Sequence, residues 1–316
     1  MRVEIDPEIF RALDPGKPAI QAVFRLLETF DTGRHDWVID PFDVDEFAAF
    51  VPSHFPSLAG SYGSMARLAS KREAAWTGKG QHLAIVVDTE SLVDLVADLA
   101  QSAVVVVEDE FSDGDCFLAT LIEVFGPERL RRAYDDGWLK VQHSGGSGRM
   151  PRVAARAARQ FRRLIRVMAF LDSDRMTLDS PGNADKAASL AHHCAYVHLL
   201  AWREAENYVP DSVLHICGDT RLARERVRIL RRLLPRQRGV YDMKSGFRKG
   251  IPADQMEEFA DVRADDLAVL REGFGSNILT KLFELRFELT AADFEAVDSG
   301  AAADLRALLA AVDRLV

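Results

Sequence analysis

The chain is poor in cysteine: Cys116, Cys194 and Cys217 are the only three among 316 residues. Their number is odd and no two form a Cys-x-x-Cys pair, so the sequence predicts neither a disulfide framework nor a zinc ribbon. It also lacks an apolar run of the roughly eighteen residues needed to cross a bilayer, and charged residues stand at its start. We therefore expect a reduced, cytoplasmic protein that is neither secreted nor inserted in a membrane.

Nucleotide-binding signatures are absent too. No Gly-x-x-x-x-Gly-Lys-Ser/Thr phosphate loop occurs, so the sequence offers no ATPase of that class. The formal net charge of −9 argues against a protein that coats nucleic acid with its whole surface. Acids of a metal site would add to this negative charge, however, and a local basic surface can still bind phosphates. Net charge therefore leaves the partner open.

What the sequence does contain is a set of acids placed directly after apolar runs. The run Ala103–Val107 has no polar alternation, which is typical of a strand covered on both faces of a parallel sheet. Two similar runs end near Leu171 and Ala201. The acids that follow the three runs are Glu108, Asp109, Glu110, Asp113, Asp172, Asp174, Glu204 and Glu206. Because ligands of parallel sheets bind beyond the carboxyl ends of the strands, these acids predict a site for Mg²⁺ or Mn²⁺.

Strand-like and helix-like segments alternate from residue 103 onwards. Strands are expected at 103–107, 138–142, 167–171 and 196–201, and helices at 115–125, 151–164 and 185–194. This alternation predicts an α/β fold with a doubly wound, mostly parallel sheet flanked by helices. A short strand at 83–87 is expected at an edge of the same sheet. The regions expected are an N-terminal α/β module of unknown role at 1–98, a catalytic domain at 99–250 and a helical C-terminal region at 251–316.

Four motifs together resemble a TOPRIM domain. They are Glu108 at the end of the first strand, the turn Ser144-Gly-Gly-Ser-Gly148, the pair Asp172 and Asp174, and Arg-Glu-Ala-Glu-Asn-Tyr at 203–208. The last motif makes the chain similar to TOPRIM nucleases of the overcoming-lysogenization-defect type and to the nuclease subunit of the PARIS phage-defence system. The resemblance covers roughly residues 100–250. It implies a metal-dependent nuclease that hydrolyses DNA or RNA as an antiviral defence effector.

The resemblance also implies roles for single residues. Metal ligands would come from Glu108, Asp113, Asp172, Asp174, Glu204 and Glu206, with Glu108 also transferring protons. Either Lys244 or Lys249 would stabilise the charge that develops on the phosphate. Asp109 departs from the family, which usually has glycine there. Many relatives are fused to an ATPase, so a separate ATPase or sensor protein is an expected partner, and a homodimer stays open.

A basic stripe is the expected contact for the nucleic-acid backbone. Its members are Arg152, Arg156, Arg159, Arg163 and Arg166, spaced by three or four residues so that they would share one face of a continuous helix. A second stripe of arginines lies between 221 and 232. The alternative for either stripe is a solvated helix face whose arginines pair with nearby acids.

Two other functions use the same fold. The first is a catalytically silent TOPRIM scaffold that binds nucleic acid or a partner protein, for which Asp109 is the best support. The second is a primase-like nucleotidyl transferase, which uses the same acids but requires nucleoside triphosphates. Hydrolysis does not require them, so a requirement for nucleoside triphosphates distinguishes the nucleotidyl transferase from the nuclease.

Overall fold

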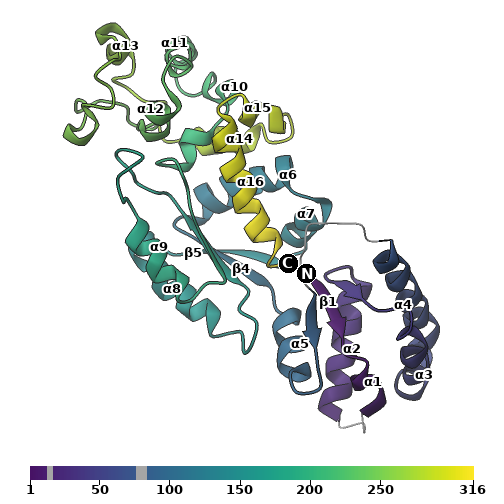
Figure 1. The fold of residues 1–316 in the computed structure, drawn as a ribbon. Coiled ribbons are helices and arrows are strands. Elements are labelled where there is room, and N and C mark those ends of the chain that lie inside the picture. Colours follow the sequence, from purple (N-terminus) through teal and green to yellow (C-terminus); the bar gives the residue numbers. More distant parts are fainter. Residues whose placement is uncertain (13–16, 76–83) are drawn as a thin grey trace.

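The computed structural model of the chain describes residues 1–12, 17–75 and 84–316. Its described strands form two separate parallel sheets, one of three strands and one of four. Figure 1 shows the three-stranded sheet with its helices at one end of the molecule, the four-stranded sheet in the middle, and α10 to α13 at the other end. The fold is therefore α/β, with parallel sheets flanked by helices.

The N-terminal part is built on the three-stranded sheet, in the order β2-β1-β3. Its strands are β1 (Arg2–Ile5), β2 (Asp36–Val38) and β3 (Ile85–Val87), and its helices are α1 (Glu8–Ala12), α2 (Lys17–Asp31), α3 (Val44–His54), the short 3₁₀ helix η1 (Pro56–Leu58), α4 (Ala59–Ala74) and α5 (Leu92–Ala100). Val3, Leu26 and Phe47 are fully buried in a core of its own. The strand expected from residue 83 thus pairs with β1 rather than with the main sheet, which corrects the prediction; Leu83 itself lies outside the described residues.

The four-stranded sheet has the order β5-β4-β6-β7, and all its pairings are parallel. Its strands are β4 (Ala103–Val107), β5 (Leu139–His143), β6 (Val167–Leu171) and β7 (Tyr196–Leu199). Every residue of the two central strands, β4 and β6, is buried, because helices cover both faces. This explains why their sequences lack polar alternation.

The helices of this part cover the sheet from both sides. They are the π-helical segment η2 (Glu110–Leu118), α6 (Ala119–Phe125), α7 (Glu128–Asp135), the 3₁₀ helix η3 (Ser147–Arg149), α8 (Met150–Ala158), α9 (Ala184–Ala191) and the 3₁₀ helix η4 (Ala205–Tyr208). Val105 and Met168 pack on the side of α6 and α7, whereas Val104 and Ala169 pack on the side of α8 and α9. Successive residues of a strand point to opposite faces, so each central strand contributes to both cores.

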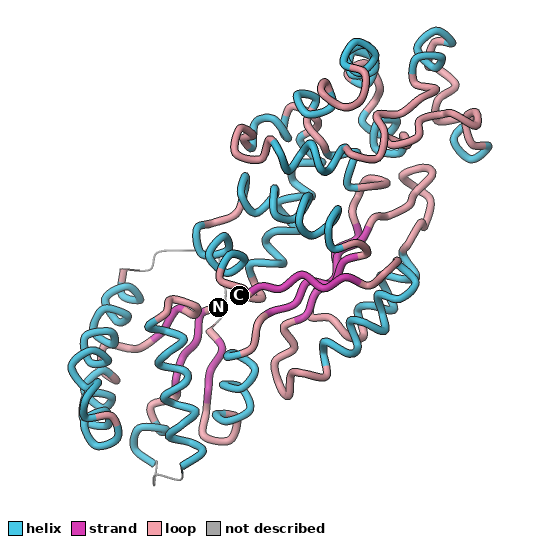
Figure 2. Tube along the Cα trace, turned by 180° about the vertical axis from the view of Figure 1, so that it is seen from behind, coloured by secondary structure: helices cyan, strands magenta, loops and turns pink. Residues whose placement is uncertain are grey.

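The chain after Pro210 is helical, so helices occur both in the region expected at 251–316 and in the stretch before it. This C-terminal part comprises α10 (Asp211–Leu214), α11 (Thr220–Leu230), α12 (Pro235–Val240), the 3₁₀ helix η5 (Ala253–Gln255), α13 (Ala264–Val269), α14 (Ile278–Glu284), α15 (Ala291–Glu295) and α16 (Ser299–Asp313). Helix α16 returns to the four-stranded sheet, so both ends of the chain lie close together in Figures 1 and 2. Within the described ranges, no helix combines the length and apolar character that a membrane crossing requires.

Asp98, at the end of α5, joins the N-terminal part to the four-stranded sheet. Its buried carboxylate accepts hydrogen bonds from the backbone N–H groups of Arg162 (2.9 Å), Arg163 (2.7 Å) and Leu164 (2.8 Å). The helix expected to run to residue 164 ends at Ala158. The N–H groups of Gln160 and Phe161 close a last turn on Ala157 and Ala158, and those of residues 162–164 donate to Asp98 instead of continuing the helix.

The early end of α8 corrects the predicted basic stripe. Arg152 and Arg156 are exposed on α8, Arg159 follows its last residue, and Arg163 lies in the connection to β6. Arg166 is fully buried, and its guanidinium donates to the carbonyl oxygens of Leu99, Gln101 and Leu315. The five arginines do not form one helix face, and Arg166 is not accessible to nucleic acid.

Candidate active site

The candidate site lies where the connections of the four-stranded sheet diverge. The chain leaves β4 towards β5 on one side, and it leaves β6 towards β7 on the other. Such a switch in direction opens a crevice at the carboxyl ends of the two central strands, where ligands of open α/β sheets bind. Glu108 and Asp172 are the residues that immediately follow β4 and β6.

Beyond β4 the chain forms the π-helical segment that carries Asp113. The Asp113 carboxylate accepts a hydrogen bond from the backbone N–H of Asp109 (2.9 Å), which fixes its orientation. Gly114 follows, where a Cβ atom would lie 2.6 Å from the Val141 side chain of β5, so only glycine allows this turn to approach the sheet. The Glu108 side chain is half-buried and forms no hydrogen bond or ion pair with the residues that the structure describes.

Beyond β6 the side chains of Asp172 and Asp174 have different hydrogen-bond partners. The Asp172 carboxylate accepts the backbone N–H of Ala205 (2.9 Å) and points towards the segment after β7. Asp174 is exposed and adopts a left-handed backbone conformation (φ +53°), and its carboxylate accepts the side-chain amide of Asn183 (2.7 Å). A Cβ atom at Gly182 would lie 2.0 Å from the Ser173 carbonyl oxygen, so the turn is tightly closed. Asp172 therefore faces the other acids, whereas Asp174 is held in its own turn.

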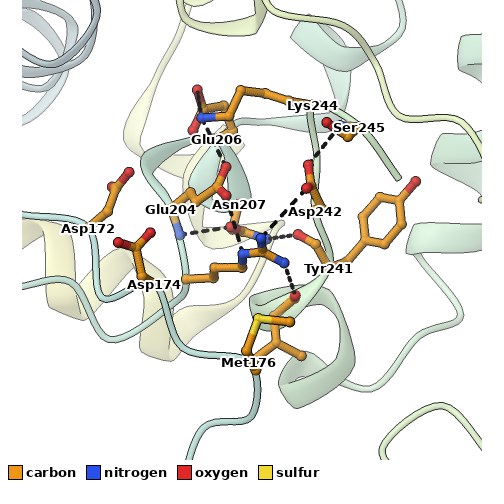
Figure 3. A network of polar contacts seen from close by, with 12 residues as sticks. Asp172, Asp174, Met176, Glu204, Glu206, Asn207, Tyr241, Asp242, Lys244 and Ser245 are labelled. Carbon is orange, nitrogen blue, oxygen red and sulfur yellow. Dashed lines mark hydrogen bonds and ion pairs between the residues drawn. The ribbon is translucent and has the colours of Figure 1, made fainter. Parts of the chain in front are cut away.

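Beyond β7 a short turn presents two glutamates, which are 7% and 5% exposed at Glu204 and Glu206. Asn207 fixes this turn: its amide donates to the carbonyl oxygens of Arg238 and Tyr241 (2.8 Å each) and accepts the N–H of Glu204 (2.9 Å). In Figure 3, Asp172 and Asp174 lie to the left of Glu204 and Asn207. The three strand ends thus bring Asp113, Asp172, Glu204 and Glu206 into one acid cluster.

The structure distinguishes the two candidate lysines. The Lys244 ammonium reaches into the acid cluster and lies 3.0 Å from Oε2 of Glu204 and 3.1 Å from Oε1 of Glu206 (Figure 3). Arg203 adds a second cation, 3.2 Å from Glu204. Lys249 is exposed and contacts none of these acids.

Burial, and after it the repulsion between like charges, governs the protonation of the acid cluster. Burial raises the pKa of Asp172 well above its usual value, and Glu206, Asp113 and Glu204 raise it further. The pKa of Asp113 is raised to about 6 by burial and by the charges of Glu206 and Glu108. Burial also raises the pKa of Glu204, although Lys244 lowers it. Burial opposes the charge of Lys244, but Glu206 and Glu204 outweigh it, so the pKa of Lys244 is raised.

The acids fit a divalent cation by their chemistry. Oxygen donors are the ligands that Mg²⁺ and Mn²⁺ prefer, and a cation would relieve the repulsion that raises these pKa values. Among the described residues, no three His, Cys, Asp or Glu side chains stand in a ready arrangement for a metal. Two acids of the cluster instead contact Lys244, so a cation would have to compete with the ammonium group for Glu204 and Glu206.

Sequence reasoning missed the residues that position the acids. Asn183 and Asn207 hold the turns after β6 and β7, and Arg203 pairs with both Glu204 and Asp242. The Pro-Gly-Asn sequence at 181–183 is a turn signal, so the turn itself could have been predicted. The hydrogen-bond partners of the asparagine amides could not have been predicted, because these partners lie on other segments of the chain.

Comparison with models of protein families, with curated proteins and with solved structures finds no match to this chain. The site is therefore interpreted from its own geometry and chemistry.

Without metal, the acid cluster is expected to make the protein less stable as pH rises from about 4 to about 6. Asp113 titrates near pH 6 when folded and near 3.9 when unfolded, so in this window the folded state binds more protons and stability falls as pH rises. The two-unit difference corresponds to about 3 kcal/mol by pH 7. Urea unfolding at pH 4.5, 5.5 and 7 should show this slope in the wild type and a shallower slope in Asp113→Asn. Equal slopes would contradict the assignment.

Proposed function

We propose that this chain is a divalent-metal-dependent nuclease of the TOPRIM type that hydrolyses phosphodiester bonds of DNA or RNA, acting as an antiviral defence effector. One observation carries the proposal: four carboxylates from three strand ends gather at the switch point of a parallel sheet, with Lys244 among them. The resemblance to TOPRIM nucleases implies metal-binding roles for these same acids.

Asp113, Asp172 and Glu206 would hold the cation, with Glu108 close enough to raise the pKa of Asp113. A bound cation supplies charge to bind the scissile phosphate and lowers the pKa of a water molecule. Lys244 carries a fixed positive charge into the same space, where it can neutralise an oxygen of the phosphate. The half-buried carboxylate of Glu108, which has no partner among the described residues, is placed to accept a proton.

A catalytically silent scaffold is the second candidate. The ion pairs of Lys244 with Glu204 and Glu206 favour it, because they neutralise two of the acids without any metal. A scaffold would bind nucleic acid or a partner protein and would cleave neither DNA nor RNA.

Cleavage of plasmid DNA, linear DNA and total transfer RNA separates the two functions. The wild type is expected to cut at least one substrate with Mg²⁺ or Mn²⁺ and none after chelation. Asp172→Asn should lower the cleavage rate by at least about 100-fold, because it removes a central carboxylate of the metal site. Asp185→Asn, an exposed carboxylate on α9, is the matched control and should cut at the wild-type rate.

Full cleavage by Asp172→Asn would show that the acid cluster is not the active site. Metal-independent cleavage would contradict the role of the cation. A requirement for nucleoside triphosphates would point instead to nucleotidyl transfer. No cleavage of any substrate by the wild type would favour the scaffold.

A further inference from the structure

A groove of 530 Å³ lies next to the turn that carries Lys244, between that turn and helix α13. Apolar side chains of Phe247, Ile251 and Leu267 contribute to its walls, and three cations line it: Arg248, Lys249 and Arg271. All three cations are exposed. No acidic residue lines the groove in the part of the chain that the structure describes.

The three groove cations have no partner in the part of the chain that the structure describes. None of them forms a hydrogen bond or an ion pair within the described residues, unlike many other arginines of the C-terminal part. Two acids next to groove residues are already paired: Asp266 of α13 lies 2.6 Å from Arg232, and Glu272 lies 3.5 Å from Arg226. The groove therefore presents a positive charge that the protein itself does not neutralise.

The sequence around the groove is also basic. Residues 219–250 contain eleven Lys or Arg and only three Asp or Glu, whereas the whole chain has a formal charge of −9. An unneutralised basic surface in an acidic protein is complementary to a polyanion, and it attracts one without drawing nucleic acid to the rest of the surface.

The groove is held at a fixed place relative to the acid cluster. The turn is closed by the N–H of Ser245, which donates to Asp242 (2.7 Å). A Cβ atom at Gly246 (φ +64°) would lie 2.6 Å from the Leu270 carbonyl oxygen, and one at Gly273 would lie 2.4 Å from the Lys244 carbonyl oxygen. The two segments are thus packed backbone to backbone. Lys249 is five positions after Lys244 in the chain, so their Cα atoms are at most about 18 Å apart.

We propose that this groove binds the phosphodiester backbone of the nucleic-acid substrate a few nucleotides away from the bond to be cut. The inference rests on the proposed function, because the occupant is the same substrate. Arg248, Lys249 and Arg271 contact its phosphates, and the apolar walls accept sugar or base surface. The assignment gives Lys249 a binding role, outside the acid cluster, and leaves Lys244 as the cation of that cluster.

Binding of labelled oligonucleotides in EDTA tests the groove without cleavage. The probes are a single-stranded RNA, a single-stranded DNA of the same sequence and its duplex, titrated by fluorescence anisotropy at several salt concentrations. Arg248→Ala combined with Lys249→Ala should weaken binding of the preferred probe by about 10-fold, and the slope of log K against log[salt] should fall by about 1.4 to 1.8. The control pair is Arg25→Ala with Lys71→Ala. It removes the same charge from exposed cations of the N-terminal part that have no ion pair within residues 1–12, 17–75 and 84–316, and it should leave affinity and slope unchanged.

The inference would be overturned by wild-type affinity and slope in the groove variant, or by no binding of any probe by the wild type. Equal loss in the control pair would also overturn it, because the effect would then come from net charge. The binding test of the groove and the cleavage test of the nuclease can fail independently of each other. Loss of binding in the groove variant alone, with no cleavage by the wild type in Mn²⁺, would support the groove and contradict the nuclease. Cleavage by the wild type with normal binding by the groove variant would support the nuclease and contradict the groove.

Discussion

Replacing Lys244 with methionine is expected to destabilise the metal-free protein by about 2 to 4 kcal/mol at neutral pH. Breaking a buried ion pair leaves an uncompensated charge, and Glu204 and Glu206 have side chains only 9% and 7% exposed. The loss of unfolding free energy should stay below the largest values known for a buried ion pair, because the Lys244 side chain is 38% exposed and Arg203 still contacts Glu204. Glu206 would keep no partner among the described residues, so it carries most of the penalty.

The penalty of Lys244→Met should grow with pH. Lys244 lowers the pKa of Glu204, so its removal lets burial raise that pKa further above the unfolded value. The folded variant then binds more protons than the unfolded chain above about pH 4.3, and its stability falls as pH rises through that window. Urea unfolding at pH 5 and pH 8 should therefore show a larger difference from the wild type at pH 8.

Divalent cations should reverse this destabilisation. Without the ammonium group, Mn²⁺ meets no competing cation at Glu206 among the described residues, and only Arg203 at Glu204, so it should raise the melting temperature of Lys244→Met more than that of the wild type. Lys281→Met is the control: its ammonium pairs at 2.7 Å with Glu284, whose side chain is 51% exposed, so it should cost at most about 1 kcal/mol. The same loss in both variants, or no response to Mn²⁺, would contradict the placement of Lys244 at a cation site.

Strand ends were the part of the site that the sequence could predict. A run such as Ala103–Val107 has no polar residue because both of its faces are covered, and this fixes its place at the centre of a parallel sheet. The residues after β4 and β6 must then lie at the same edge. The expectation of a parallel sheet was enough to place Glu108 and Asp172 at the same edge of it, whereas the direct pairing of β4 with β6 comes from the structure.

Contacts between distant segments were not predictable in the same way. The spacing of Arg152, Arg156 and Arg159 suits a long helix as well as the short one observed, because the end of α8 is set by Asp98 on another helix. A three-residue strand such as β3 carries no information about its partner. The difference between Lys244 and Lys249 depends on a turn closed by Gly246 against Leu270, which no local pattern specifies.

Asp98→Ala is expected to cost about 3 to 5 kcal/mol, because it removes the acceptor of three backbone N–H groups at once. Each unsatisfied buried donor costs about 1 to 3 kcal/mol, and water can reach the ones nearest the surface, so the total stays below the sum of three full penalties. Arg166 adds to the loss, since Asp98 is the acid whose charge favours its buried guanidinium. Urea unfolding measures the loss, and hydrogen exchange at residues 162–164 should accelerate.

Asp94→Ala on the same helix is the matched control for this junction. Asp94 also contacts the segment after α8, through Arg162 (2.6 Å), but its side chain is 41% exposed. An exposed pair contributes at most about 1 kcal/mol, so the two aspartates of α5 should differ by at least about 2 kcal/mol. A smaller difference would mean that the backbone donors at 162–164 find water or other acceptors when Asp98 is removed. A large difference would show that one buried carboxylate both ends α8 and attaches the N-terminal part to the sheet that carries the acid cluster.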